Sequence, residues 1–450
     1  MGDILTGYHV SDATWFYLSL LLVIAVFFRF GRVWSLRNLD LILLLSISPG
    51  LLLVSQHANV GYVWLFVVTA LLLLRLFCDS LLERRPRLEQ NLNMPGMAFM
   101  CASALAFLMT SVVTKPLPAT AIETIERGED IFNREPRSAN QEQSSTGGPV
   151  SQILVAPLIA PSKAVVFSNG TPAQQAVGWE SVAARTMAIL AHIAVISALL
   201  FLGYRHFGDF QIGLAMATLY LLLPCTAYDV AEINHVLPAA LILWAFASYR
   251  RPWIAGSLMG LACGTLYYPV FLLPLWAAFY GRRGALRFCL ALCIVAAVLL
   301  GSFALTSTDV NSFLRQTFGW IDWSNGLKFR SGETTGFWSE HDPSYGIPVF
   351  VAYMVMLVVL TVWPRKKNLE HLMAHSTALV VGTQFWYPQQ GGVYLLWYLP
   401  LLLLVVFRPR LAQLLPPGSE PAERSSRRAT PVRRKEAATS AATTGSRLFR

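Results

Sequence analysis

Charge is scarce in this sequence, because only 13% of its 450 residues are Asp, Glu, Lys or Arg, about half the share of an ordinary soluble domain. Hydrophobic residues make up 55% of the chain. They gather in runs that are too long for the core elements of soluble domains. This composition excludes a set of soluble domains and predicts an all-α, polytopic bundle of membrane helices.

The sequence also lacks the signatures of several common protein classes. Its six cysteines lie in or beside apolar segments rather than in large polar loops, which argues against a disulfide framework. The first residues, MGDILTGYHVSD, contain no basic region and no small-residue cleavage site, so we expect no cleaved signal peptide. There is no P-loop, dinucleotide fingerprint or nucleophile elbow. We therefore expect no cofactor and no serine triad.

Charged side chains are absent from the middle of every apolar run, where only His192 and His375 lie deep. An ion-coupled transporter usually carries a carboxylate at that depth, so this class is disfavoured. His371 and His375 in HLMAH have the spacing of zinc ligands, but the residues between them are apolar and no general base accompanies them. We therefore expect no metal site.

The apolar runs predict about eleven membrane spans, each near the roughly 20 residues that a helix needs to cross a bilayer. The predicted spans cover residues 13–30, 39–55, 61–78, 95–113, 182–203, 209–226, 234–249, 286–306, 346–363, 371–385 and 391–407.

Basic residues alternate between successive connections. The connections that contain Arg29, Arg84 and Arg250 are basic, whereas QHANV, AYDVAEI and WYPQQ contain no Lys or Arg. Basic connections face the cytoplasm, so we expect the N-terminus outside and the C-terminus inside a bacterial inner membrane. The net charge of +10 lies in these connections and in the tail, which indicates topology and contact with anionic lipid rather than with nucleic acid.

Residues 253–281 carry no charge and lie between two basic turns, Arg250 with Arg251 and Arg282 with Arg283. One ordinary span here would place the later basic connections outside. We therefore expect a broken or re-entrant hairpin that returns to the same side. The expected break is at Pro269, because proline removes a backbone donor and clashes with the preceding turn. The alternatives are two short complete spans or one kinked, overlong helix.

These features divide the chain into four parts. The last part is rich in Ser and Arg and is expected to be a disordered cytoplasmic tail that binds anionic lipid. The parts are membrane helices over residues 1–113, a large external loop over 114–180, a membrane core over 181–407 with a second external loop over 307–345, and the tail over 408–450.

The first candidate cluster for chemistry lies in PCTAYDVAEINHVLP, at the external ends of two spans. Asp229 and Glu232 have the spacing of one face of a turn, and His235 opens the next helix. A carboxylate at a membrane boundary can act as a general base, because partial desolvation raises its pKa toward neutrality. The alternative is a solvated loop whose Asp or Asn caps the helix.

The second candidate cluster lies in the loop over 307–345. Its basic residues suit the phosphate of a substrate, its tryptophans offer faces for a sugar or lipid, and its acids and histidine suit acid–base or metal-binding roles. The alternative is an aromatic belt with solvated charges. The candidate residues are Arg315, Lys328, Arg330, Trp320, Trp323, Trp338, Glu340, His341 and Asp342.

AEINHVLPAALILWAFASYRRPWIAGSLMGLACGTLYYPVFLLPLWAAFYGRRG resembles the polytopic glycosyltransferases of the C superfamily (GT-C), especially their bacterial mannosyltransferase-like branch. FWYPQQGGVYLLWYLPLLLLVVFRPR is similar to the last span of such enzymes. The resemblance covers residues 230–285 closely and 181–407 loosely. It is carried by the polar helix start at residues 232–235, by Ala255, Gly256 and Gly260 after a basic turn, by the break at Tyr268 and Pro269, and by Tyr394, Trp397 and Pro400.

The resemblance implies an inverting transfer of a sugar from a polyprenyl-phosphate donor to an acceptor at the external face. Asp229, Glu232 and His235 are its candidate catalytic residues, and Tyr268 is a candidate substrate-binding residue. Cations would stabilise the departing phosphate, and a groove lined by the small residues of the hairpin would hold the lipid. The resemblance implies a catalytic carboxylate in the first large external loop, so Glu123, Glu126, Glu129 and Asp130 are alternative bases, although they belong to no recognisable motif.

Two other functions fit the same features. A transporter or flippase for a lipid-linked intermediate would require a polar path through the bilayer, of which the sequence shows little. A non-catalytic membrane scaffold would not require its external carboxylates. Neutralising those carboxylates therefore distinguishes an enzyme from a scaffold.

Overall fold

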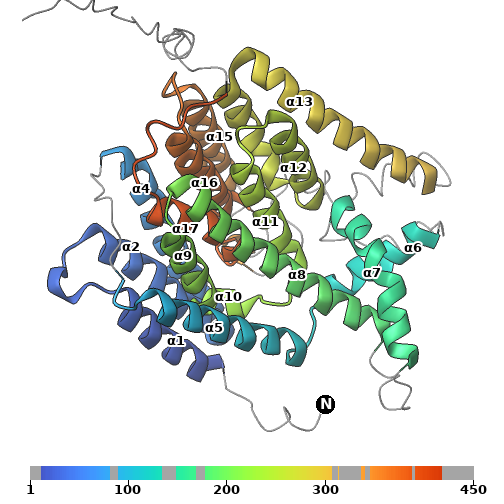
Figure 1. Cartoon of the computed structure of the whole chain (residues 1–450), viewed down its shortest axis with the longest axis horizontal. Coiled ribbons are helices and arrows are strands. Elements are labelled where there is room, and N and C mark those ends of the chain that lie inside the picture. Colours follow the sequence, from blue (N-terminus) through green and yellow to red (C-terminus); the bar gives the residue numbers. More distant parts are fainter. Residues whose placement is uncertain are drawn as a thin grey trace, which may run out of the picture.

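The computed structural model describes residues 12–81, 90–133, 148–168, 178–306, 313, 336–339, 345–387 and 391–417. These residues form a bundle of α-helices without a strand (Figure 1), so the predicted all-α class is confirmed. Among the described residues, five helical segments are long and apolar enough to cross a membrane: Leu36–Gln56, Ala58–Phe77, Met94–Thr114, Trp179–Phe207 and Tyr268–Ala304. The count of about eleven spans stays a prediction.

The described residues of the N-terminal part form five α-helices. The predicted span over 39–55 is divided at Ser46, whose side chain donates to the carbonyl of Ile42. These helices are α1 (Asp12–Phe27), α2 (Leu36–Leu45), α3 (Ile47–Gln56), α4 (Ala58–Phe77) and α5 (Met94–Thr114).

Much of the predicted external loop over 114–180 is helical. The amphipathic segment ATAIETIERGEDIF lies within α6 (Ala119–Asn133), and ILVAPLIAP lies within α7 (Pro149–Ser168). The two helices pack on each other and on the N-terminal half of α8 (Trp179–Leu202), at one edge of the bundle (Figure 1). The described parts of the loop therefore form a packed helical pair beside the membrane core.

The membrane core is built around α9, which is apolar and buried on all sides, as expected of a helix at the centre of a bundle. A π-helical turn (Gly203–Phe207) connects α8 to α9. The core helices after α8 are α9 (Phe210–Leu222), α10 (Pro224–Tyr228), α11 (Ile233–Ala247), α12 (Pro252–Thr265), α13 (Leu273–Thr306), α15 (Gly346–Val362), α16 (Leu369–Trp386) and α17 (Leu399–Phe407).

The last predicted span, over 391–407, is α-helical only in α17. Before it, Gly392 adopts a positive φ of 93°, and only a short 3-10 turn, η7 (Leu395–Trp397), follows. Pro400 then occupies the first turn of α17, where its missing N–H costs nothing because that donor has no helical partner. The first half of the predicted span therefore forms a loop at the end of the bundle.

The predicted hairpin is broken where the sequence indicates. Helix α12 ends at Thr265, and Pro269 lies in the 3-10 turn η4 (Tyr268–Leu272) that leads into α13. The hydroxyl of Tyr280 then donates to the carbonyl of Tyr249 over 2.8 Å, so the two basic turns lie together. With 14 residues, α12 is about 21 Å long, shorter than the roughly 30 Å hydrocarbon core.

Gly281 separates two helical stretches within α13. Its φ of 63° and ψ of −179° are accessible to glycine and strained for other residues. The second stretch runs on to Thr306 and packs along α12. The contact depends on the glycines of α12: Gly256 lies against the carbonyl of Phe288, and Gly260 faces Val295.

The prediction that the hairpin's small residues line a lipid groove is therefore wrong for these glycines. Their faces are covered by α13, and Gly264 is covered by Val150 of α7 and by Leu299. Small residues allow two helix backbones to approach closely in a membrane. Here they are used for helix packing.

Replacing Gly256 by Ala is expected to destabilise the protein by about 1–3 kcal/mol, because the added Cβ would overlap the backbone carbonyl of Phe288, which cannot move without shifting α13. Gly301→Ala is the matched control, since nothing lies within 4 Å of a Cβ at Gly301. The measurement is the free energy of unfolding by SDS titration of the purified protein. Equal values for the two variants would contradict the close packing of α12 on α13.

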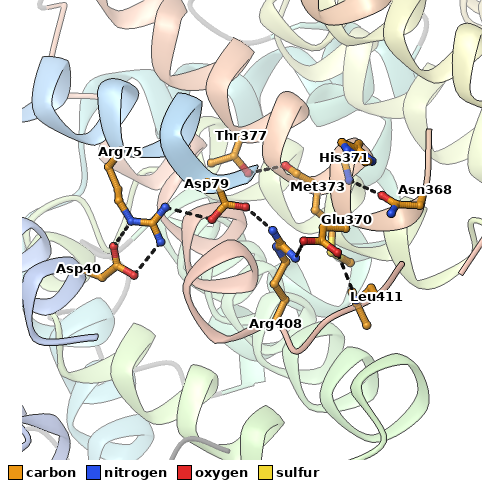
Figure 2. A network of polar contacts seen from close by, with 10 residues as sticks. All are labelled: Asp40, Arg75, Asp79, Asn368, Glu370, His371, Met373, Thr377, Arg408 and Leu411. Atoms are coloured by element: carbon orange, nitrogen blue, oxygen red, sulfur yellow. Dashed lines mark hydrogen bonds and ion pairs between the residues drawn. The ribbon is translucent and has the colours of Figure 1, made fainter. Parts of the chain in front are cut away.

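Four buried charged side chains and the half-buried Glu370 lie in a row at one end of the bundle (Figure 2). Arg75 donates from Nε and Nη2 to both oxygens of Asp40, over 2.5 and 3.0 Å, and from Nη1 to Asp79 over 3.0 Å. Arg408 contacts Asp79 and Glu370. The network joins α2, the end of α4, the start of α16 and the end of α17, all on the side that the charge pattern assigns to the cytoplasm.

The histidines of HLMAH lie beside this network. Their ring centroids are 5.9 Å apart, and they line a small cavity of about 70 Å³ together with Asp79, Glu370 and Arg408. His375 Nδ1 is 3.2 Å from the carbonyl of Leu360. In the part of the chain that the structure describes, no group of three or more His, Cys, Asp or Glu side chains is arranged to hold a metal ion.

Candidate functional site

The two predicted carboxylates lie in the connection between α10 and α11, outside the membrane-spanning helices. The chain leaves helical geometry at Asp229. The backbone N–H of Glu232 then donates to the carbonyl of Asp229 over 3.1 Å, which closes a tight turn. Asp229 is half-buried, with 24% of its side chain exposed. The structure therefore brings both acids to one point at the end of the bundle.

Helix α6 covers Glu232. The hydroxyl of Thr120 donates to Glu232 Oε2 over 2.7 Å. On the other side, Asn234 Nδ2 lies 3.4 Å from Glu232 Oε1 and 3.3 Å from the hydroxyl of Thr124. Glu232 is therefore held between the external helical pair and the first turn of α11, and its position depends on how α6 packs.

A cation approaches the same connection from α5. Lys115 follows the last residue of that helix, and its Nζ donates to the carbonyl of Ala227 over 3.0 Å. Its charge acts on Asp229 and partly balances the two carboxylates. The site thus contains two acids and one lysine, which leaves it acidic when both acids are ionised.

The surroundings of the two acids shift their pKa values. The pKa of Asp229 is raised from its ordinary value of 3.8 to about 7, mainly by burial and then by the charge of Glu232, while Lys115 opposes the shift. Burial also raises the pKa of Glu232, but the hydrogen bonds from Thr120 and Asn234 favour its ionised form and oppose that rise. The two carboxyl groups are therefore not equivalent.

His235 lies between the acids and an aromatic cluster. Its Nδ1 is 3.9 Å from Asp229 Oδ2, too far for a direct hydrogen bond. Its ring centroid is 4.9 Å from that of Tyr394 and 6.0 Å from that of Trp397, edge to face in both cases. His235 thus links the carboxylates to the rings of the loop before α17.

The aromatic cluster joins η4 to η7. Trp397 stacks on Tyr268 and on Tyr394, with centroids 4.6 and 4.5 Å apart. Tyr387, at the end of α16, adds an edge-to-face contact to Tyr394 at 5.1 Å. Tyr268 is only 1% exposed, and its role in substrate binding stays a prediction.

Several buried polar atoms around the site have no hydrogen-bond partner among the described residues. They include Asn234 Oδ1, His235 Nδ1, the hydroxyl of Tyr268 and Trp397 Nε1. Buried polar groups in folded proteins are almost always paired with protein or with an ordered molecule. Their concentration beside two carboxylates is therefore typical of a binding site.

Of the second predicted cluster, only Trp338 lies within the described residues. Trp338 is buried, and its Nε1 donates to the carbonyl of Phe385 over 2.9 Å while its ring packs near Phe66. The remaining predicted residues of that loop lie outside the described residues: Arg315, Trp320, Trp323, Lys328, Arg330, Glu340, His341 and Asp342.

The alternative acids on α6 have other contacts. Glu123 pairs with Arg127 at 2.8 Å, and Glu129 pairs with Lys163 of α7. Glu126 is exposed. These acids lie on the surface of the helical pair or form ion pairs within it, whereas Asp229 and Glu232 face the core.

Sequence reasoning missed Thr120 and Lys115 as parts of the site, and it recognised Asn234 only as part of the polar helix start. A signal was available for Lys115, because it is a basic residue at the external end of a predicted span, where the positive-inside rule disfavours Lys. No comparable signal marks Thr120. The role of Thr120 depends on the packing of α6, which brings this residue next to Glu232, more than a hundred positions away in the chain.

An apolar groove of about 430 Å³ runs between α4, α15 and α16. Leu73, Tyr353, Gly382 and Phe385 are among the residues that line it. Phe385 is two residues before Tyr387 of the aromatic cluster. One end of the groove is therefore adjacent in the chain to the cluster beside the carboxylates.

Comparison with protein-family models, curated proteins and solved structures finds no match for this chain.

Proposed function

We propose that this protein is an integral-membrane glycosyltransferase that moves a sugar from a polyprenyl-phosphate donor to an acceptor at the external face of a bacterial inner membrane. The observation that carries the proposal is the pair Asp229 and Glu232 at the end of the bundle, beside unpartnered polar atoms and stacked aromatic rings. Such an arrangement can bind a polyhydroxyl compound and remove a proton from it.

Asp229 is the general base of the proposed reaction. A base works best when its pKa lies near the operating pH, and the pKa of Asp229 is raised to about 7. Glu232 already accepts hydrogen bonds from Thr120 and Asn234. Two acids whose surroundings differ in this way usually divide their roles, so Glu232 orients the acceptor while Asp229 takes the proton.

The proposed step is a single displacement. Asp229 takes the proton of an acceptor hydroxyl, and the acceptor oxygen forms a bond to the anomeric carbon of the donor sugar. The bond from that carbon to the phosphate oxygen breaks, its electron pair stays on the phosphate, and the configuration is inverted. Lys115 is a described cation whose charge acts on Asp229, and Arg315, Lys328 and Arg330 are the predicted phosphate ligands.

The donor's lipid chain suits the apolar groove between α4, α15 and α16. The described side chains that line most of it are aliphatic or aromatic, and burial of apolar surface contributes roughly 25 cal/mol per Å². The groove begins near Phe385, two residues before the aromatic cluster. The sugar and phosphate of a lipid held there would be placed toward the outer end of the bundle.

The test is transfer of radiolabelled mannose from polyprenyl-phosphate mannose by the purified wild-type protein in lipid nanodiscs, with crude membrane glycolipids as acceptors. Formation of a new labelled product is expected. A protein that neither binds nor turns over this donor, nor the corresponding glucose donor, is not a glycosyltransferase of this kind. Movement of the intact donor across the bilayer without transfer would instead identify the flippase.

The topology can be tested separately. A membrane-impermeant maleimide is expected to label Ser144→Cys in intact cells, and to label Arg282→Cys and Ser426→Cys only after permeabilisation, because basic turns face the cytoplasm. The background should lack the exposed native cysteines Cys289 and Cys293. External labelling at position 282 would overturn the hairpin that returns to the cytoplasmic side.

A further inference from the structure

His192 is a buried polar residue that the proposed mechanism does not use. It lies in α8 with no exposed surface. Its Nδ1 is 2.9 Å from the hydroxyl of Tyr220 in α9, and its Nε2 is 3.0 Å from the carbonyl of Val230. Val230 directly follows Asp229, so this histidine reaches the carboxylate connection from inside the membrane core.

The protonation of the ring follows from its partners. A backbone carbonyl only accepts hydrogen bonds, so Nε2 must carry the proton and donate to Val230. Nδ1 then accepts the hydrogen of the Tyr220 hydroxyl. Both ring nitrogens are satisfied by a neutral imidazole, and no charge is required at membrane depth.

Tyr220 is itself tied to the same connection. Its carbonyl accepts a hydrogen bond from the hydroxyl of Thr226 over 2.6 Å, and its side chain has no exposed surface. The chain on both sides of Asp229 is thus anchored to α9, through Thr226 of α10 directly and through Val230 by way of His192. Between these anchors lies Asp229.

We propose that His192 is a positioning residue, which holds the Val230 carbonyl, and thereby the Asp229 and Glu232 side chains, in the geometry required for proton removal. The inference rests on the proposed function for its catalytic consequence. The structural part of the inference is independent of that function, because removing His192 should loosen the connection whether or not the protein transfers sugar.

The structural part has a native reporter in Cys225. This thiol lies in α10, four residues before Asp229, and is only 2% exposed. A maleimide reaches it only when the connection opens. Losing the hydrogen bond to Val230 leaves a buried carbonyl without its donor, so opening should become more frequent by about tenfold.

The experiment compares His192→Leu, His192→Gln and Tyr220→Phe in the full-length protein in nanodiscs. Gln keeps an N–H donor that can reach the Val230 carbonyl. Thr377→Val is the matched control, because its buried hydroxyl bonds only within α16, to the carbonyl of Met373 (Figure 2). The readouts are the rate of Cys225 modification, mapped by mass spectrometry, and kcat and KM for transfer from polyprenyl-phosphate mannose.

For His192→Leu we expect Cys225 to react about ten times faster, and kcat to fall by about 10- to 100-fold with little change in KM, because a misplaced base weakens only the transition state. His192→Gln should recover most of both effects. Tyr220→Phe should show a smaller change in the same direction, and it tests the inference if the Leu variant does not fold.

A merely structural histidine would lower the melting temperature while leaving Cys225 reactivity and kcat at the values of Thr377→Val, and this result would overturn the inference. So would a Gln variant as impaired as the Leu variant. If the wild-type protein transfers no sugar, the proposed function fails, while the reactivity of Cys225 still decides whether His192 holds the connection.

Discussion

Asp229→Asn is expected to lower the rate of sugar transfer by about 10²- to 10⁴-fold, the usual effect of removing a general base. Asn keeps the size and one oxygen of the side chain but cannot take a proton at neutral pH. The loss should appear in kcat with a well-folded protein, because the connection is held by Glu232, His192 and the backbone rather than by the Asp229 carboxylate. The measurement is steady-state transfer from polyprenyl-phosphate mannose.

The pH dependence of the wild-type transfer rate tests the assignment of Asp229 as the base independently. Because the pKa of Asp229 is raised to about 7, the rate should increase as the pH rises through 7 and the carboxylate becomes ionised. Because Glu232 interacts with Asp229, the midpoint of the pH–rate curve reports the coupled titration of the two acids rather than that of Asp229 alone. A rate that is already maximal at pH 5 would exclude Asp229 as the base.

Stability should change with pH in the opposite sense to the rate. The folded-state pKa of Asp229 lies above its ordinary value of 3.8, so the folded protein holds this proton more tightly than the unfolded chain. The resulting stabilisation is complete below about pH 4 and is lost as the pH rises through 7. Asp229→Asn should therefore unfold at a higher temperature than the wild type at pH 8, with a smaller difference at pH 5.

Three further variants serve as controls. Glu232→Gln should lower the rate less than Asp229→Asn, because Thr120 and Asn234 still hold the Gln side chain in place. Glu126→Gln and Asp342→Asn should leave the rate unchanged. A large loss at either of these two, with full activity of Asp229→Asn, would move the base to another loop. Full activity in all four would show that none of these acids is the base.

Arg75→Leu is expected to cost about 3–5 kcal/mol in the free energy of unfolding, the usual penalty for breaking a buried ion pair from one side. Arg75 gives three N–H donors to Asp40 and Asp79 at one end of the bundle (Figure 2). All three side chains are under 10% exposed. Leu would leave both carboxylates buried without those donors. The measurement is SDS-induced unfolding of the purified protein.

The double variant Arg75→Met with Asp40→Leu should recover much of this loss, because apolar side chains of similar volume can replace a buried pair at little cost. Arg205→Leu is the control for removing an exposed arginine, and it should change the stability by less than about 0.5 kcal/mol. If Arg75→Leu behaves like Arg205→Leu, the network does not hold α2, α4 and α17 together.

The all-helical class and the meeting of the two basic turns at Arg250 and Arg282 followed from the sequence alone. Long apolar runs with few charges can only be helices that satisfy their own backbone hydrogen bonds in a membrane. The basic turns at Arg250 and Arg282 indicated a returning segment, and proline chemistry placed its break at Pro269. Asp229, Glu232 and His235 were recognisable because they are titratable residues at the junction of two apolar runs, in the segment that resembles the GT-C enzymes. All of these are local properties of the chain.

Tertiary structure decided what these residues touch. Only packing brings Thr120 to Glu232, Lys115 to Ala227 and His192 to Val230, because each pair is tens of residues apart or more and no local pattern encodes the contact. Packing also turned the hairpin's glycines toward α13 and placed the apolar groove between α4, α15 and α16. The physical reason is that burial and the hydrogen bonds from Thr120 and Asn234 together set the pKa values of the two acids, and both depend on the whole fold.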